Sequence, residues 1–187
     1  MLNFNAILKE HLEVIKNCES LLPQLEKTAE KIITALKNGG TVYWLGNGGS
    51  ASDAQHMAAE LVGRFKKERR ALPSLSLSTD TSLLTALSND YDFNIIFSRQ
   101  LEAFCKPNDI VIALSTSGNS ENILKGIDMA KSKGAFTIAF TGETGGKLKA
   151  KVDTCFLIPS KITARIQEAT TLLCHTMCEK IDDVLSS

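Results

Sequence analysis

Two polar residues, His56 and Glu60, have the types and the spacing for proton transfer. They lie four residues apart in a segment that we expect to be helical from Ser50 to about Phe65, so both side chains project from one face. A carboxylate base beside a second acid–base group can remove a proton from one atom of a substrate and return it to a neighbouring atom. The alternative is an ordinary polar pair on a helix surface, where such pairs are common.

A glycine-rich loop, Gly46-Asn-Gly-Gly-Ser50, precedes this helix and follows a short apolar run. Glycines permit close approach of a ligand, and a helix start offers free backbone N–H groups and the positive end of the dipole. The loop is therefore expected to bind a polyhydroxyl chain or an anion through Asn47, Gly48, Gly49 and Ser50. A tight turn without a ligand is the alternative.

The same loop matches the loose dinucleotide fingerprint G-x-G-x-x-G/A at Gly46, Gly48 and Ala51. Such sites need an acidic residue about 20 positions further on. The nearest candidate, Asp80, lies 34 residues after Gly46, so dinucleotide binding is only a weak alternative. The chain also lacks a P-loop sequence, which argues against a nucleoside triphosphate site.

A second loop, Ser115-Thr-Ser-Gly-Asn-Ser120, also follows an apolar run and precedes a helical segment. Its hydroxyls, amide and glycine at a helix start can surround a phosphomonoester with neutral donors. A helix cap is the alternative, but a cap needs one such residue and this loop supplies five of six. We therefore expect Ser115, Thr116, Ser117 and Ser120 to hold a phosphate.

Three further positions have weaker signals. His175 lies among Leu172, Leu173 and Met177, a setting typical of a core or interface histidine. Arg64, one turn beyond Glu60, could keep Glu60 ionised, contact a substrate, or simply be solvated. Asn89-Asp90 favours a turn after the preceding helix.

Short apolar runs alternate with helical segments along the chain. The expected helices lie before the first strand, over 4–36 with a break at Pro23, and then near 50–65, 81–88, 121–133 and 163–185. The expected strands are 41–45, 75–77, 110–114, 136–140 and 154–158. A loop over 142–146 is expected to be exposed.

This alternation predicts an α/β fold, a single three-layer domain with a mainly parallel five-stranded sheet flanked by helices. We expect one domain over 1–187, in which 1–38 forms extra N-terminal helices for oligomer packing and 41–187 forms the core that binds the sugar phosphate. Ligands of such sheets bind beyond the carboxyl ends of the strands, where both polar loops lie.

The overall composition excludes several classes of function. Lys plus Arg and Asp plus Glu both number 21, so no net field attracts nucleic acid or an anionic membrane. No apolar stretch approaches the roughly 20 residues of a membrane span, and 1–10 lacks the apolar run of a secretory signal. The five cysteines contain no C-x-x-C pair, which favours buried thiols in a reducing compartment and a cytoplasmic protein.

The polar segments together resemble the phosphoheptose isomerase (sedoheptulose 7-phosphate isomerase) family of the sugar isomerase (SIS) domain class, which has a flavodoxin-like fold. The resemblance covers essentially the whole chain. It rests on 46–56, on Glu60-Leu-Val-Gly-Arg64, on 114–120 and on Arg165-Ile-Gln-Glu168 with His175.

The resemblance implies conversion of sedoheptulose 7-phosphate to D-glycero-D-manno-heptose 7-phosphate through an enediol, for a bacterial surface polysaccharide such as lipopolysaccharide, in a homotetramer. It implies that Glu60 is the general base and His175 the general acid. It also implies one zinc per subunit, held by His56, Glu60, Gln167 and His175. The implied substrate-binding residues include the two loops together with Glu60, Arg64, Asn89, Asp90 and Gln167.

Gln167 and His175 are eight residues apart, about 12 Å along a helix at 1.5 Å per residue. Ligand bonds to zinc are about 2 Å long. Their side chains would have to fold toward each other, or they would come from different subunits, and we expect a zinc site between subunits.

Two other functions stay open. One is a non-enzymatic protein-binding module similar to the DnaA initiator-associating protein, which shares the SIS domain. The presence of His56, Glu60, Gln167 and His175 speaks against it. The other is an isomerase or regulator for a different phosphosugar, which the serine loop alone does not exclude.

Overall fold

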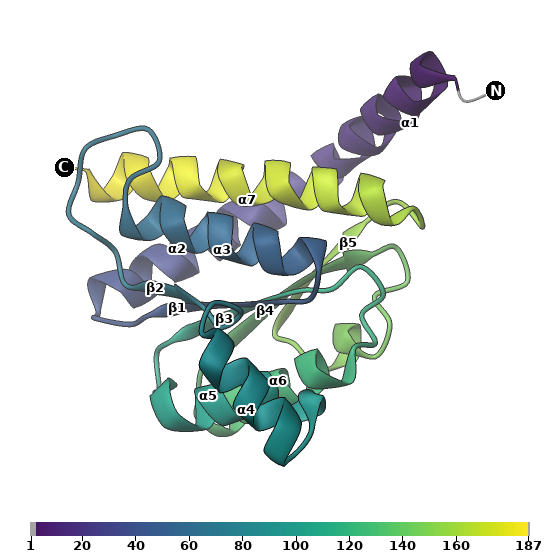
Figure 1. Cartoon of the computed structure of the whole chain (residues 1–187). Helices are drawn as coiled ribbons and strands as arrows, with labels where there is room; N and C mark the ends of the chain where they lie inside the picture. Colours follow the sequence, from purple (N-terminus) through teal and green to yellow (C-terminus); the bar gives the residue numbers. More distant parts are fainter. Residues whose placement is uncertain (1–2, 187) are drawn as a thin grey trace.

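Helices and strands alternate through residues 3–186, which are the residues that the computed structural model describes (Figure 1). The α-helices are α1 (Phe4–Asn17), α2 (Leu22–Lys37), α3 (Gly49–Val62), α4 (Thr81–Asp90), α5 (Ile96–Phe104), α6 (Glu121–Ser132) and α7 (Thr163–Leu185). The strands are β1 (Val42–Gly46), β2 (Ser74–Ser76), β3 (Ile110–Leu114), β4 (Phe136–Gly142) and β5 (Thr154–Ile158). Short 3₁₀ turns lie at η1 (Cys18–Leu21), η2 (Phe93–Ile95) and η3 (Leu148–Ala150).

The five strands form one parallel sheet in the order β2-β1-β3-β4-β5. The predicted fold class is therefore confirmed. In this register Gly46 at the end of β1 pairs with Leu114 at the end of β3. The two polar loops consequently leave the same edge of the sheet from adjacent strands.

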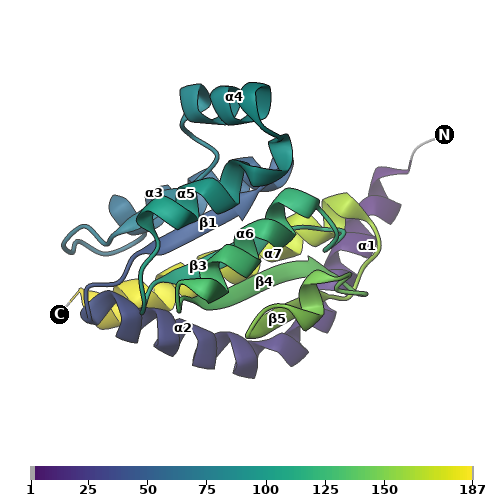
Figure 2. The same ribbon diagram turned by 90° about the horizontal axis from the view of Figure 1, so that it is seen from below.

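Each face of the sheet is covered by helices because successive strand residues point to opposite sides. Trp44 and Ile112 belong to a buried cluster with residues of α2, α3 and α7. Tyr43 and Val111 belong to the other cluster, with residues of α5 and α6. Figures 1 and 2 show the resulting three layers, with α4 lying outside the body of the sheet.

Most elements lie where the sequence predicts them, and four details differ. The N-terminal helices break at η1, and Pro23 lies in the first turn of α2, where its missing N–H costs nothing. Asn89 and Asp90 form the last turn of α4 rather than a turn after it. The helix α5 is an addition that the sequence reading missed. Of the predicted exposed loop, Gly142 is the buried end of β4, whereas Glu143 and Thr144 are exposed.

The first helix projects from the rest of the molecule (Figure 1). Val14 is its one buried residue among those described. Four of the five cysteines are buried and Cys155 is half-buried, as expected for unpaired packing thiols. Over residues 3–186, no helix has the length and apolar character needed to cross a membrane.

Candidate active site

The glycine loop turns sharply from β1 into α3. A Cβ on Gly46 would lie 2.2 Å from the backbone oxygen of Ser50, so only glycine fits there. Gly48 has a φ of +56°, a conformation that favours glycine. These two glycines allow the chain to reverse and present the N-terminal end of α3 toward the space beyond the strands.

The glycine loop is tied to the serine loop by a pair of amides. Asn47 Nδ2 donates to Asn122 Oδ1 at 2.9 Å, and Asn122 Nδ2 donates to Asn47 Oδ1 at 2.8 Å. Asn122 lies in the first turn of α6 and is 2% exposed. The amide of Asn47, predicted to face the substrate, is thus mainly occupied in fixing the distance between the loops.

The serine loop has hydroxyls available for a ligand. Ser120 occupies the N-cap position of α6 but makes no side-chain cap bond, which argues against the helix-cap interpretation. Within residues 3–186, no protein atom hydrogen-bonds to the side-chain oxygens of Ser115 and Thr116. A backbone hydrogen bond holds the loop against the segment after β4, because the carbonyl oxygen of Gly118 (φ +64°) accepts the N–H of Leu148.

A narrow gap, too tight for a water molecule, lies between this loop and the starts of α3 and α7. Its lining includes Ser50, Asp53, Ser115, Thr116, Gln167 and Thr170. Gln167 lies so close to the glycine loop that a Cβ on Gly49 would come within 2.6 Å of its Nε2. A pocket of about 180 Å³ lies on the other side of the loop and is lined by Asn47, Ser78, Leu84 and Phe93.

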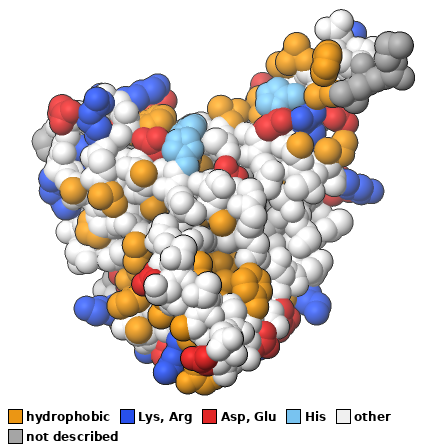
Figure 3. Space-filling view, in the orientation of Figure 1, with side chains coloured by type: hydrophobic (Ala, Val, Ile, Leu, Met, Phe, Trp, Pro, Cys, Tyr) orange, Lys and Arg blue, Asp and Glu red, His pale blue; other side chains and the backbone are white. Residues whose placement is uncertain are grey.

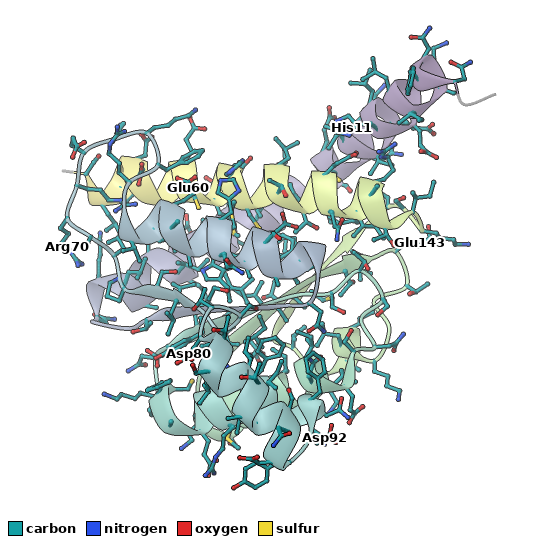
Figure 4. The ribbon with its side chains drawn as sticks, viewed as in Figure 1. His11, Glu60, Arg70, Asp80, Asp92 and Glu143 are labelled. Atoms are coloured by element: carbon teal, nitrogen blue, oxygen red, sulfur yellow. The ribbon has the colours of Figure 1, made fainter. Side chains whose placement is uncertain are left out.

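The helices α3 and α7 run side by side and bring the proton-transfer residues together (Figure 4). His56 Nε2 lies 2.9 Å from Glu60 Oε1 and 3.4 Å from His175 Nε2. His56 is 47% and Glu60 21% exposed at the side chain, and Figure 3 shows histidine at the surface on this face. His175 therefore joins the pair that sequence spacing predicts.

Burial and neighbouring charges shift the pKa values of two groups in this region, His175 and Asp53. Burial first, and the charge of His56 second, lower the pKa of His175, while Glu60 opposes them. The lowered pKa makes the imidazolium form of His175 the stronger acid. Burial also raises the pKa of Asp53, against the opposing effects of a bond from Thr171 and the charge of His56.

The three residues could also hold a metal ion. His56, Glu60 and His175 each offer a ligand atom, and these atoms lie within 4.8 Å of one another. Tetrahedral bonds of about 2.0–2.1 Å place ligand atoms about 3.3 Å apart, close to the 3.4 Å between the two imidazole nitrogens. The donor set and spacing thus fit a divalent ion such as zinc. Gln167, on the same helix as His175, lies two helical turns before it and beside Gly49.

Three other predicted residues have partners outside this group. Arg64 lies beyond the end of α3, is 56% exposed, and pairs with Glu68 at 2.9 Å rather than with Glu60. Asn89 and Asp90 are exposed at the end of α4 and hydrogen-bond each other at 2.8 Å.

Sequence reasoning missed four residues that support the site. Asp53 lies three residues before His56, and this spacing could have indicated its position on the same helix face. The other three are Asn122, Arg69 and Asp182, and no local sequence pattern indicates them. Asn122 contacts Asn47 across 75 residues, and Arg69 contacts Asp182 across 113.

The chain is similar to known proteins along nearly all of its length. Residues 4–142 match the SIS domain family. The phosphoheptose isomerase of Aquifex aeolicus is 52% identical over 180 residues, covering 96% of this chain and 94% of that protein. The corresponding protein of Aliarcobacter butzleri is 47% identical, with 97% and 98% covered.

Solved structures agree with this similarity. The phosphoheptose isomerase of Neisseria gonorrhoeae superposes with a TM-score of 0.90 at 39% identity, with 96% of each chain covered. The Francisella tularensis enzyme gives a TM-score of 0.92 at 35% identity, again with 96% of each chain covered. The chain therefore belongs to the phosphoheptose isomerase family of SIS-domain proteins.

Proposed function

We propose that this protein is a cytoplasmic aldose–ketose isomerase that converts sedoheptulose 7-phosphate to D-glycero-D-manno-heptose 7-phosphate, for a bacterial surface polysaccharide. The observation that carries the proposal is the convergence of Glu60, His56 and His175 on adjacent helices that start beside the two polar loops. Relatives that bear the name phosphoheptose isomerase cover nearly the whole chain and support it.

In the proposed reaction, Glu60 takes a proton from C1 of the open-chain ketose while a ring N–H of His175 donates its proton to the C2 carbonyl oxygen. The electron pair of the broken C–H bond forms the C1–C2 double bond of an enediol. Glu60 then returns its proton to C2, and the O1 hydroxyl gives its proton to His175 as the C1 carbonyl forms. Both groups end as they began.

The substrate contacts are assigned by the character of each loop. Ser115, Thr116, Ser117 and Ser120 would hold the phosphate through hydroxyl and backbone donors at the start of α6. The glycine loop and Gln167 would contact the sugar chain, with Asn89, Asp90 and Arg64 completing the site by movement or from another copy of the chain.

Zinc, as the resemblance implies, would be held by His56, Glu60 and His175, with Gln167 supplied by a second copy. When bound there, it would polarise an oxygen of the sugar. This shared arrangement is one reason to propose a homotetramer. The exposed apolar side chains of α1 are a second reason.

The decisive variant is Glu60→Gln. Loss of the base should lower kcat by about 100-fold or more, because general-base catalysis contributes that much. It should also stop exchange of the substrate C1 hydrogen with deuterated solvent, measured by NMR. Glu102→Gln, on the exposed surface of α5, is the matched control and should leave both unchanged. Near-full turnover by Glu60→Gln would refute the mechanism.

Turnover of the wild-type protein with a panel of ketose phosphates separates this function from its two alternatives. A preference for the seven-carbon substrate supports the proposal, and a preference for a pentose or hexosamine phosphate indicates another isomerase. Absence of turnover with all of them indicates a binding module.

A further inference from the structure

The ring of His175 is held between two other rings. Phe65 stacks on one side, with ring centroids 5.1 Å apart and planes 19° from parallel. His56 meets it edge-on, at 4.9 Å and 78°. The stacked face leaves the imidazole little room to turn, so the direction of its Nε2 toward His56 depends on where Phe65 lies.

Phe65 does not belong to a helix or strand. It lies in the irregular segment between α3 and β2, which includes Arg64, Lys66 and Lys67, all exposed. A segment of this kind needs specific contacts to hold one conformation, because fixing each residue costs about 1–2 kcal/mol of backbone entropy.

Those contacts converge on one buried carboxylate, Asp182 of α7. Its Oδ2 accepts the backbone N–H groups of Phe65 at 3.2 Å, Lys66 at 2.7 Å and Lys67 at 3.1 Å. Its Oδ1 accepts Nε–H of Arg69 at 2.6 Å. The side chains of Asp182 and Arg69 are 1% and 0% exposed.

Arg69 extends the connection to the last turn of α3. Its Nη2 donates to the backbone oxygen of Glu60 at 2.7 Å, and its Nη1 donates to that of Leu61 at 2.9 Å. Burying an ion pair is costly unless hydrogen bonds satisfy the charges, and here they do. The pair therefore links the end of α3, the irregular segment and α7 into one unit.

We infer that Phe65 is a positioning residue for His175, and that the Arg69–Asp182 pair holds Phe65 in place. The inference rests on the proposed function, in which His175 handles the oxygen protons. A ring that only covers the core would affect stability, whereas a positioning ring also affects turnover and the environment of the imidazole.

The test compares three substitutions of Phe65. Phe65→Leu keeps apolar cover but loses the flat ring, Phe65→Ala loses both, and Phe65→Tyr keeps the stack. We expect the Leu and Ala variants to lower kcat by about 10-fold, with KM within about twofold, because small misplacements of a reacting group cost up to 100-fold. Phe65→Tyr should retain kcat.

A second readout does not depend on activity. Protein labelled with ¹³C-histidine gives signals for three imidazoles, assigned with the His11→Gln and His56→Gln variants. Loss of the ring current of Phe65 should move the His175 signal in the Leu and Ala variants but not in the Tyr variant. If the wild-type protein fails to isomerise yet these shifts occur, the proposed function falls and the positioning role stands.

Asp182→Asn tests the link, and Asp183→Asn is its control, since Asp183 is the next residue, is 60% exposed and pairs with Lys67. Asp182→Asn should lower kcat and move the His175 signal. In the double variant with Phe65→Leu, it should lower kcat little further than Phe65→Leu does alone. Should Asp182→Asn fail to fold, the Phe65 series decides. Unchanged kcat and an unmoved His175 signal in Phe65→Leu would overturn the inference.

Discussion

At the scale of single residues, the amide pair between Asn47 and Asn122 sets the spacing of the two loops. Asn122→Ala would leave the half-buried amide of Asn47 without its partner, at a cost of about 1 kcal/mol. We expect KM for the sugar phosphate to rise several-fold while kcat changes less, because the loops bind substrate and Glu60 lies elsewhere. Steady-state kinetics and urea denaturation measure the two effects, and an unchanged KM would contradict the role of the pair.

Gly118 offers a second prediction at this scale. A Cβ there would lie 2.2 Å from the backbone oxygen of Gly145, in addition to the strain of its positive φ. Gly39 has a similar φ of +81° but open space around it, so Gly39→Ala isolates the strain, about 1–2 kcal/mol. Gly118→Ala should lose clearly more stability in urea and should raise KM. Equal losses in the two variants would show that the loop absorbs the clash.

Residue spacing predicted the site unevenly. The His56–Glu60 pair followed directly from helix periodicity, and the structure confirms their contact. Arg64 fails to reach Glu60 because α3 ends at Val62, where Gly63 turns the chain away. The end of α3 also depends on Arg69, which bonds to its last turn and to Asp182. Because Asp182 lies 113 residues further along the chain, the local sequence gives no sign of this contact.

At the scale of elements, the strands were the most predictable part of the fold. Short runs of apolar residues between polar turns identified β3, which is buried throughout, and β5, in which only Phe156 and Ile158 are buried. The helix α5 was missed because two helices, α4 and α5, fill the single connection between β2 and β3. The side-by-side placement of α3 and α7, which brings His175 to His56, depends on packing against the sheet and has no sequence signal.

The projecting helix α1 is fastened by a polar cluster with α7. His11 Nδ1 lies 2.7 Å from Glu168 Oε2, and Arg165 Nη2 donates to Glu168 Oε1 at 2.5 Å. Glu168→Gln should weaken both contacts and raise the hydrogen-exchange rates of amides in α1 without changing those in the middle of α7. Glu13→Gln, at an exposed position of α1, is the control. Unchanged exchange in α1 would assign its attachment to Val14 and to the bonds from Arg165 to Glu10 and to the backbone oxygen of Ile7.

At the scale of the whole molecule, Asp182 should make stability depend on pH. Burial would raise its pKa, but the N–H groups of Lys67 and Lys66 and the guanidinium of Arg69 together lower it. The ionised form therefore stabilises the fold above the unfolded pKa of about 3.9, and this contribution is lost as the pH falls through the folded value.

Urea denaturation between pH 7 and pH 3 checks this expectation. Asp182→Asn should be less stable than the wild type by about 3 kcal/mol at pH 7, since it breaks a buried ion pair. The difference should shrink as the pH falls from the unfolded pKa of about 3.9 through the lower folded value, where the wild-type carboxylate also takes up a proton. A difference that stays constant with pH would show that the lost stability comes from packing and not from the charge.

The face of α1 that points away from the body predicts assembly. Phe4, Leu8 and Leu12 are 78%, 56% and 56% exposed, four residues apart and so on one side of the helix, and Figure 3 shows apolar side chains along this projection. Such a stripe on a helix that leaves its own domain is suited to packing against another copy.

The double variant Leu8→Glu/Leu12→Glu would place two charges on this stripe, and we expect it to lower the mass measured by light scattering from that of the proposed tetramer. If Gln167 completes the site from a second copy, turnover should fall together with the mass, because dissociation into smaller species removes Gln167 from the site. Lys9→Glu changes the charge beside the stripe and should leave the mass unchanged. A double variant that keeps the tetrameric mass would place the interface elsewhere, and one that loses mass but keeps full turnover would place the whole site within a single chain.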